Sequence, residues 1–292
     1  MHGLILKGIG SFYTVLTSDG GRYVCRARGK FRKEGVSPVP GDNVEFELSP
    51  EKDSDGYLMK IEPRKNLLIR PAVANVDKLI IVIAASLPRP DLLLVDKLLL
   101  QCEQMKITPV ICVNKCDESD DAAQILAQYA PSGYKAICVS AMTGYGLDEL
   151  RTELAGCVSC FSGQSAVGKS SILNALLPEL DLLTGGLSRK TDRGRHTTRH
   201  AELWPVFGGV VADTPGFSLF ELDSIEPEKL ALLYPEMRAH LGECRFSQCL
   251  HIKEPDCAVK PLLLSGELSN ERHARYTLIM EELKEKRKHK YD

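Results

Sequence analysis

Apolar and polar positions alternate in short runs through the first part of the chain. Five runs have the length and composition of strands, and they span residues 4–6, 12–16, 23–27, 44–48 and 57–61. Clusters of glycine, proline, serine and aspartate separate these runs, which is typical of tight turns between strands. Five short strands in so short a stretch predict that residues 1–66 form a small closed β-barrel of the OB-fold type.

The hydrophobic pattern changes after a joint at residues 64–75. Residues 79–84 form an uninterrupted apolar run rich in β-branched side chains, typical of a strand that is buried on both faces of a parallel sheet. Further runs of this kind alternate with segments of helical spacing. This βαβα alternation predicts a doubly wound α/β domain over residues 67–222. Residues 223–292, apart from one cysteine-rich loop, favour a third, mostly helical domain.

A phosphate-binding motif follows the apolar strand at residues 157–161. Residues 163–170 fit G-x-x-x-x-G-K-[ST], the P-loop, and an apolar helical segment comes next. In such a loop the backbone N–H groups and the helix N-terminus bind phosphate oxygens. The alternative, a strand–helix turn with a chance lysine, does not explain why strand, loop and helix occur in the required order. We expect nucleotide contacts from Ser162, Gly163, Gln164, Ser165, Ala166, Val167, Gly168, Lys169, Ser170 and Ser171.

A base-reading motif, N-K-x-D, follows another apolar strand and consists of Asn114, Lys115 and Asp117. Guanine presents two adjacent N–H donors that one carboxylate accepts, whereas adenine presents an acceptor there, so Asp117 would select guanine. Ser140 and Ala141 follow a third strand and match the loop whose backbone N–H reads guanine O6. Ligands of parallel sheets bind where strands end, which is where both motifs lie.

A third motif, D-x-x-G, runs from Asp213 to Gly216. In GTPases this aspartate holds Mg²⁺ and the glycine N–H senses the γ-phosphate. We expect the hydroxyl of Ser170, Asp213 and a switch threonine to bind Mg²⁺. The threonine is Thr198 or, alternatively, Thr197. GTP or GDP and Mg²⁺ are therefore the predicted cofactors of this site.

Hydrolysis of GTP by water needs positioning and charge stabilisation more than covalent chemistry. Lys169, Mg²⁺ and Thr198 would supply the charge. Ras-like proteins carry a water-positioning glutamine after D-x-x-G, but Phe217 stands there, and a phenyl ring cannot orient water. The nearest substitute is His196, so Lys169, Thr198 and His196 are the predicted catalytic residues. The alternative role for His196 is a loop residue that contacts RNA.

Four potential metal ligands lie close together near the C-terminus: Cys244, Cys249, His251 and Cys257. Three thiolates and one imidazole satisfy a closed tetrahedral Zn²⁺ site, and the polar residues around them argue against core cysteines. Disulfides are disfavoured in a reducing compartment. We therefore expect one structural Zn²⁺, which would supply much of the folding free energy of a region with a small core.

Overall charge gives little information, because the net charge is −2. Locally, six basic residues and no acidic residue occur between residues 22 and 33. They predict either a nucleic-acid surface on the barrel or a solvated hairpin. The basic end of the helix expected at about residues 270–290 leaves the same two alternatives. No segment resembles a signal peptide and no apolar run is long enough to span a bilayer, so we expect a cytoplasmic protein without a membrane partner.

The order of the motifs is unusual, because ordinary small GTPases carry the P-loop before the base-reading motifs. A sheet needs its strands in place rather than in one chain order, and domain termini often lie close enough to be joined. The order therefore fits a circular permutation with the usual ends fused at Gly156. With the basic barrel and the Cys/His cluster, the chain resembles the circularly permuted GTPases of small ribosomal subunit biogenesis, the RsgA (YjeQ/YloQ) family, over essentially its whole length.

This resemblance implies a cytosolic protein that hydrolyses GTP to GDP and phosphate late in the maturation of the small (30S) ribosomal subunit. It implies binding to that subunit and its rRNA, and stimulation of GTP hydrolysis there; we also expect a monomer. One alternative is an RNA-binding assembly factor whose nucleotide site is a slow or idle switch. A metabolic P-loop kinase is disfavoured by the base-reading motif and by the absence of a second substrate domain.

Overall fold

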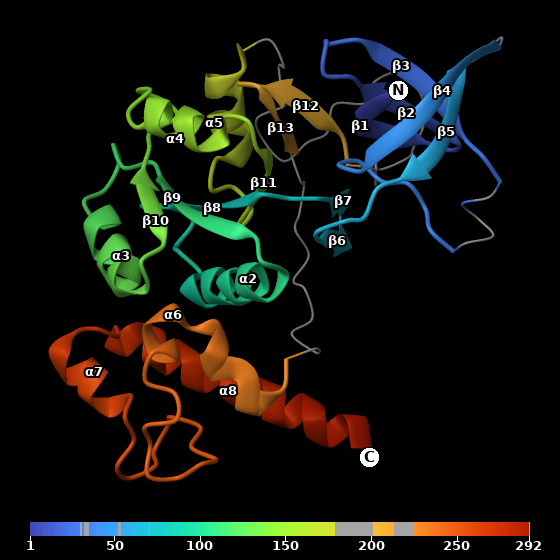
Figure 1. Cartoon of the computed structure of the whole chain (residues 1–292). Coiled ribbons are helices and arrows are strands. Elements are labelled where there is room, and N and C mark those ends of the chain that lie inside the picture. The colour runs from blue at the N-terminus through green and yellow to red at the C-terminus, as the bar shows by residue number, and fades with distance from the viewer. Residues whose placement is uncertain are drawn as a thin grey trace. The chain divides into compact units, whose positions relative to one another are not determined.

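The computed structural model (Figure 1) describes most of the chain, namely residues 1–29, 31, 35–51, 54–69, 71–178, 201–212 and 225–291. Two compact units divide it. The first comprises Met1–Leu79, Asp148–Ser162 and Lys169–Ser218, and the second comprises Ile80–Leu147, Gly163–Gly168 and Leu219–Asp292. The three domain ranges expected from the sequence stay predictions.

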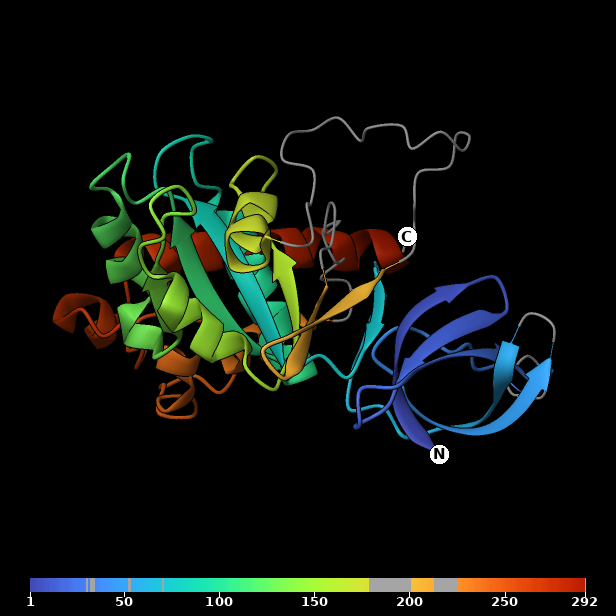
Figure 2. The same cartoon turned by 90° about the horizontal axis from the view of Figure 1, so that it is seen from above.

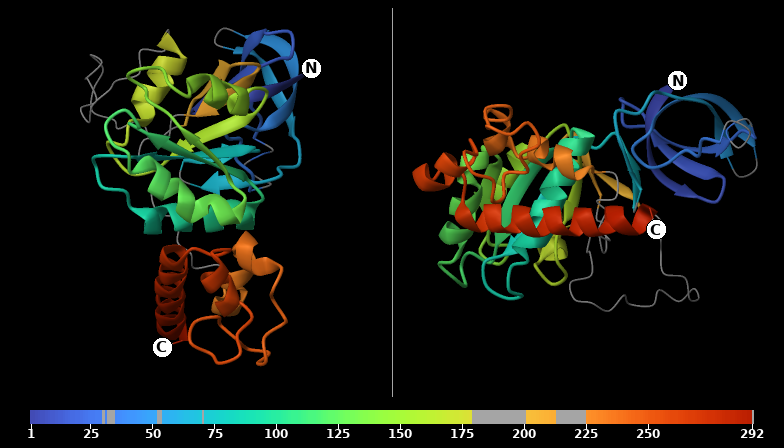
Figure 3. Two further views of the ribbon diagram at one scale, coloured as in Figure 1. Left: turned by 90° about the vertical axis from the view of Figure 1, so that its left-hand side faces the viewer. Right: turned by 90° about the horizontal axis from the view of Figure 1, so that it is seen from below.

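The N-terminal strands form a closed barrel in the order β1-β2-β3-β5-β4, and Figures 2 and 3 show these strands curving around a common interior. Their bounds are β1 His2–Ile9, β2 Phe12–Leu16, β3 Arg22–Ala27, β4 Asn43–Glu51 and β5 Ser54–Ile61. Alternate side chains point inward, so Ile5, Val15, Phe46 and Leu58 are fully buried. The expected OB-type barrel is thereby confirmed. The predicted joint contains a small hairpin of β6 Leu67–Ile69 and β7 Ala72–Ala74.

A six-stranded sheet has the order β10-β9-β8-β11-β13-β12. The strands are β8 Lys78–Ala84, β9 Thr108–Asn114, β10 Lys135–Cys138, β11 Val158–Ser162, β12 Leu203–Val206 and β13 Gly209–Ala212. β9 pairs with β10 and β11 with β13 in parallel, whereas β12 is antiparallel to β13. Residues 79–84 of β8 are all buried, as their apolar run predicts. The α/β architecture expected from the alternation is confirmed.

Helices lie between these strands along the chain. They are α2 Leu92–Met105, α3 Ala122–Tyr129, α4 Leu147–Leu154 and α5 Lys169–Leu176, with the short 3₁₀ helix η1 at Ala130–Ser132. The start of α2 is fixed by Asp91, whose side chain accepts a hydrogen bond from the Leu94 N–H at 3.0 Å. Its end is fixed by Lys106, which adopts a left-handed conformation.

The C-terminal region is mostly helical, as expected. It contains η4 Pro227–Leu233, α6 Pro235–Arg238, α7 Lys260–Ser265 and the long α8 Asn270–Tyr291 (Figure 3). Tyr234, Tyr276 and Met280 are fully buried in a core that also includes Leu100 of α2. Within the described part of the chain, no helix is both long and apolar enough to cross a membrane.

Candidate functional site

The P-loop joins the end of β11 to the start of α5, as the motif requires. Gly163 has φ +135°, and a Cβ there would lie 2.2 Å from the Val82 carbonyl oxygen, so only glycine fits. Gly168 and Ala166 also have positive φ, at 95° and 63°. This sharply curled backbone is the kind of loop in which several N–H groups converge on one anion. Lys169 then begins α5, with Ser170 in its first turn.

Asn114 joins the P-loop to the base-reading loops. Its side chain is buried at the end of β9. The Nδ2 group donates to the Val167 carbonyl at 2.9 Å, and Oδ1 accepts from the Ala141 N–H at 3.2 Å. The structure thus brings together the phosphate-binding loop and the two predicted guanine-binding loops. Both ends of the Asn114 amide contact protein, so this side chain holds the loops in place.

The other base-reading residues surround this junction. Asp117 is exposed three residues beyond Asn114, where its carboxylate is accessible to a base. Lys115 has φ 63°, and its Nζ donates to the Leu87 carbonyl. Ser140 is buried, and its hydroxyl accepts from the Thr143 N–H at 3.1 Å, which shapes the turn that presents Ala141.

The remaining P-loop residues differ in exposure. Ser162 is buried at the end of β11, whereas Ser165 is exposed and Ser171 half-buried. Gln164 accepts a hydrogen bond from the Asp91 backbone N–H at 3.3 Å, just before α2. Sequence reasoning missed this contact, because no local pattern links residues so far apart in the chain.

Of the predicted catalytic residues, Lys169 is described at the start of α5, whereas the other two and the remaining switch residues lie outside the described residues. These are His196, Thr197, Thr198, Asp213, Gly216 and Phe217. Their assignments therefore stay predictions.

The Cys/His cluster has the geometry of a metal centre. The ligand atoms of Cys244, Cys249, His251 and Cys257 all lie within 4.8 Å of one another. His251 Nδ1 lies 3.5 Å from the Cys244 Sγ and 3.4 Å from the Cys257 Sγ. A tetrahedral zinc ion would separate its nitrogen and sulfur ligands by about 3.5 Å. All ten cysteines are free thiols, so no disulfide competes for these sulfur atoms.

The protonation of the cluster also fits metal binding. Burial raises the pKa of Cys249 to about 12 and lowers the pKa of His251. The imidazole is therefore held neutral, as a metal ligand must be, while the thiolate needs a nearby cation to form. Metal binding and deprotonation are expected to occur together.

Glu254 shapes the loop between the ligands, and sequence reasoning missed it. Its carboxylate accepts from the backbone N–H groups of Leu250, Ile252 and Lys253 at 2.9, 2.8 and 3.0 Å. Burial acts to raise the pKa of Glu254, but the backbone hydrogen bonds outweigh it and lower the pKa to about 2. An acidic residue within a short loop of metal ligands is the only sequence signal that could have indicated this function.

Comparison with known proteins gives matches along nearly the whole chain. A family model described as RsgA GTPase matches residues 61–223, and one described as RsgA N-terminal domain matches residues 2–58. A protein of Geobacillus sp. (strain WCH70), named small ribosomal subunit biogenesis GTPase RsgA, is 46% identical over 98% of both chains. A protein of Caldanaerobacter subterraneus subsp. tengcongensis with the same name is 45% identical over 100% of this chain and 98% of its own.

Solved structures agree with this result. YjeQ from Thermotoga maritima is 36% identical, with a TM-score of 0.81 over 97% of this chain and 98% of its own. YloQ, described as a circularly permuted GTPase, is 37% identical, with a TM-score of 0.81 over 97% of this chain and 95% of its own.

Proposed function

The chain belongs to the RsgA GTPase family and is a GTP hydrolase, and we propose that it hydrolyses GTP to GDP and phosphate during late maturation of the small ribosomal subunit. The names of its relatives support the role in maturation of the small ribosomal subunit. The observation that carries the first part, GTP binding and hydrolysis, is the contact of Asn114 with both Val167 and Ala141. Phosphate and guanine loops that share one buried side chain form a single nucleotide site.

Within this site each residue has a distinct task. The P-loop backbone and Lys169 bind the phosphates, and Ser170, with Asp213 and Thr198, holds the Mg²⁺ ion that neutralises charge developing on them. Asp117 accepts both guanine donors, and the Ala141 N–H binds guanine O6. His196 positions the attacking water.

The metal of the Cys244, Cys249, His251 and Cys257 cluster is Zn²⁺. Three sulfur ligands and one imidazole nitrogen form a donor set that zinc prefers in closed structural sites. The ligand separations described above support a tetrahedral ion. Its function is to hold the C-terminal region together.

The barrel supplies a surface for rRNA. The Arg26 guanidinium lies 4.9 Å from the centre of the Phe12 ring, and the Arg28 guanidinium lies 5.6 Å from that of Tyr57. Cationic groups beside aromatic rings are typical of OB-fold surfaces that bind single-stranded nucleic acid. The chain acts as a cytoplasmic monomer that docks on the small subunit, and docking stimulates hydrolysis.

Guanine selection tests the nucleotide site. Asp117→Asn replaces a carboxylate that accepts both N–H donors of guanine by an amide that can donate to the 2-oxo group of xanthine. We therefore expect weaker binding of GTP and stronger binding of xanthosine triphosphate, measured by competition against a fluorescent GDP analogue. Asp120→Asn, a nearby exposed carboxylate, is the matched control and should leave both affinities unchanged. Unchanged GTP affinity in Asp117→Asn would remove the support for this site.

A further inference from the structure

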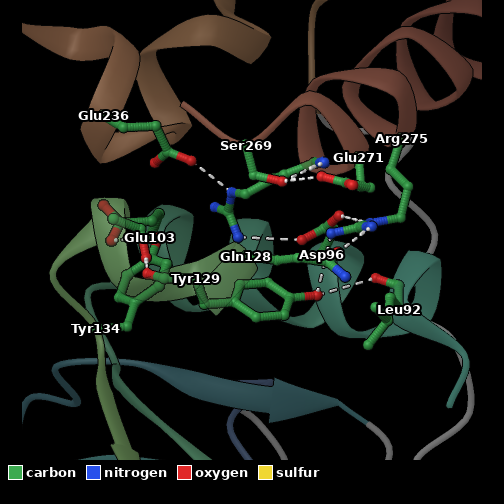
Figure 4. A network of polar contacts seen from close by, with 12 residues as sticks. Leu92, Asp96, Glu103, Gln128, Tyr129, Tyr134, Glu236, Ser269, Glu271 and Arg275 are labelled. Atoms are coloured by element: carbon green, nitrogen blue, oxygen red, sulfur yellow. Dashed lines mark hydrogen bonds and ion pairs between the residues drawn. The ribbon is translucent and has the colours of Figure 1, made fainter. Parts of the chain in front are cut away.

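A buried network of charged side chains joins the C-terminal helix α8 to helix α2 (Figure 4). Arg272 Nη1 lies 3.1 Å from one oxygen of Asp96, and Arg275 Nε lies 2.5 Å from the other. Arg272 Nε also lies 2.5 Å from Glu236 Oε1, as an ion pair whose N–H is not aligned for a hydrogen bond. The side chains of Asp96, Glu236 and Arg272 are at most 1% exposed. Two buried carboxylates thus balance the buried guanidinium group of Arg272 and the largely buried one of Arg275.

Aromatic rings enclose this network. The Arg272 guanidinium lies 5.1, 5.6 and 4.9 Å from the ring centres of Tyr129, Tyr134 and Tyr234. Such rings attract a desolvated cation, and they keep water out. A charge left alone in this environment would be strongly unfavourable, so α2 and α8 are expected to stay paired when either helix shifts.

A chain of hydrogen bonds leads from this arginine network to the P-loop. Arg275 Nη2 lies 3.5 Å from the Tyr129 hydroxyl, which donates to the Leu92 carbonyl in the first turn of α2 at 3.4 Å. Directly before that turn, the Asp91 N–H donates to the side chain of Gln164 in the P-loop. The N-terminal end of α2, from its N-cap Asp91 to Leu92, therefore contacts both the arginine network and the phosphate-binding loop.

Further side chains of α8 contact the metal-binding loop, which carries the ligands Cys244, Cys249, His251 and Cys257. The side chain of His273, next to Arg272 on α8, lies 2.7 Å from the carbonyl oxygen of the metal ligand His251. The Tyr276 hydroxyl donates to the Leu250 carbonyl at 2.8 Å. Helix α8 therefore contacts the metal-binding loop through His273 and Tyr276, and it contacts Asp96 of α2 through its two arginines.

We propose that Asp96 is a positioning residue of the nucleotide site, which couples α8 and the metal-binding loop to Gln164 in the P-loop. The charged network makes α2 and α8 move as one body, and the Asp91–Gln164 contact passes that movement to the phosphate-binding loop. A partner that displaces the metal-binding loop or α8 thereby alters nucleotide affinity. By linkage, the nucleotide alters the affinity for that partner. This inference rests on the nucleotide site proposed above.

A double-mutant cycle on the full-length, zinc-loaded protein tests this coupling. The affinity for a fluorescent GDP analogue is measured in wild type, His273→Ala, Gln164→Ala and the double variant. His273→Ala breaks the contact of α8 with the metal-binding loop and removes no metal ligand. We expect it to change nucleotide affinity by about threefold or more when Gln164 is present, and to have almost no effect in the Gln164→Ala background. Equal effects in the two backgrounds would overturn the proposal.

The same cycle in Asp96→Asn tests the assignment to Asp96. An asparagine cannot balance two guanidinium groups, so the coupling between positions 164 and 273 should vanish. If Asp96→Asn fails to fold, Arg275→Lys replaces it, since lysine keeps the charge but loses the contacts with Gln128 and Tyr129, and the coupling should fall there too. Coupling that persists in a folded variant of either kind would refute the assignment.

Lys97→Met is the matched control. Lys97 also joins α2 to α8, through an ion pair with Glu282 at 2.6 Å, but Glu282 is 35% exposed. The coupling should survive this change. If it disappears in Lys97→Met, any weakening of the helix pair is sufficient and Asp96 has no special function. A wild-type protein that does not bind the GDP analogue would instead refute the nucleotide site itself.

Discussion

The barrel and the C-terminal region each enclose a small core, but they stabilise it in different ways. The barrel closes its sheet on itself, so its backbone hydrogen bonds and its core of residues such as Ile5, Phe46 and Leu58 come from its own strands and turns. The C-terminal region consists of short helices and one long helix, and its core extends to Leu100 of α2. Both regions contain a buried carboxylate paired with an arginine, namely Asp42 with Arg64 beside the barrel strands and Glu236 with Arg272 in the C-terminal region. The C-terminal region also has a Cys/His cluster with the geometry of a metal centre. A closed sheet thus holds its core largely with its own backbone hydrogen bonds, whereas we expect a small set of helices to depend on the metal ion as well.

Loss of the metal should produce the largest difference in stability between the C-terminal region and the barrel. Metal binding by zinc-finger peptides is worth about 10–16 kcal/mol, which matches or exceeds the stability of a whole domain. In Cys257→Ser, or after zinc is stripped by a chelator, we expect amide exchange protection to be lost in residues 244–268 and kept in the barrel. Elemental analysis of the untreated protein should give about one equivalent of zinc. Full protection of the zinc-free C-terminal region would contradict the comparison.

A cavity in the barrel core should have the opposite regional effect. Phe46 is fully buried, so Phe46→Ala should lower the free energy of unfolding by about 3–5 kcal/mol, with exchange protection lost in the barrel. Phe246 in the metal-binding loop is 46% exposed and provides the matched control. Phe246→Ala should have a much smaller effect in denaturant titrations. Equal losses for the two phenylalanines would show that burial does not decide the difference.

A smaller loss is expected from Glu254→Gln. The carboxylate of Glu254 accepts three backbone hydrogen bonds, and contacts of this kind with a charged group contribute about 1.5–3 kcal/mol. Because backbone hydrogen bonds overcome burial and lower its pKa from 4.5 to about 2, the contribution is fully present at pH 7. It would be lost as the pH falls from 4.5 toward 2. Calorimetry at pH 7 should show a lower Tm for the variant; an unchanged Tm would mean that these bonds do not stabilise the loop.

The smallest change is expected from Arg245→Ala in the same loop. Arg245 forms an ion pair with Asp256 at 2.9 Å, but these side chains are 69% and 62% exposed. Exposed pairs contribute less than about 1 kcal/mol and are screened by salt. The Tm should therefore fall less than in Glu254→Gln, and the difference from wild type should shrink at high salt. A fall as large as that of Glu254→Gln would show that exposure does not rank contacts in this region.

Local patterns were sufficient to predict the barrel, the α/β alternation and the cluster of metal ligands. A strand, a glycine loop and a helix lie next to one another in the chain, and so do the four ligands, so spacing alone indicates them. The contacts of Asp96 with Arg272 and Arg275 could not be predicted in this way, because 176 and 179 positions separate the partners. In the sequence Asp96 is one of three charged residues in a largely apolar helix. Only the packing of α8 shows that its charge is balanced by Arg272 and Arg275.

The hairpin between the barrel and the sheet also could not be predicted from local patterns. Residues 64–75 contain two apolar runs of only three residues each, at 67–69 and 72–74, which are too short to predict strands, yet β6 and β7 pair there. Asn75 explains part of this, because its side chain donates to the Gly41 carbonyl at 2.9 Å and accepts from the Lys65 N–H at 2.9 Å. Single side-chain hydrogen bonds of this kind leave no periodic signal.

The most direct test of the proposed function is GTP turnover by the purified protein alone, with small ribosomal subunits and with large ones. We expect slow turnover alone, a large rise with small subunits and little change with large ones. Completion of a GTPase site in trans is worth about 10³–10⁵-fold in well-characterised cases, and His196→Ala should remove most of the rise while nucleotide affinity stays near normal. Equal turnover with small and large subunits, or no rise with either, would contradict the proposal that the small subunit is the activating partner.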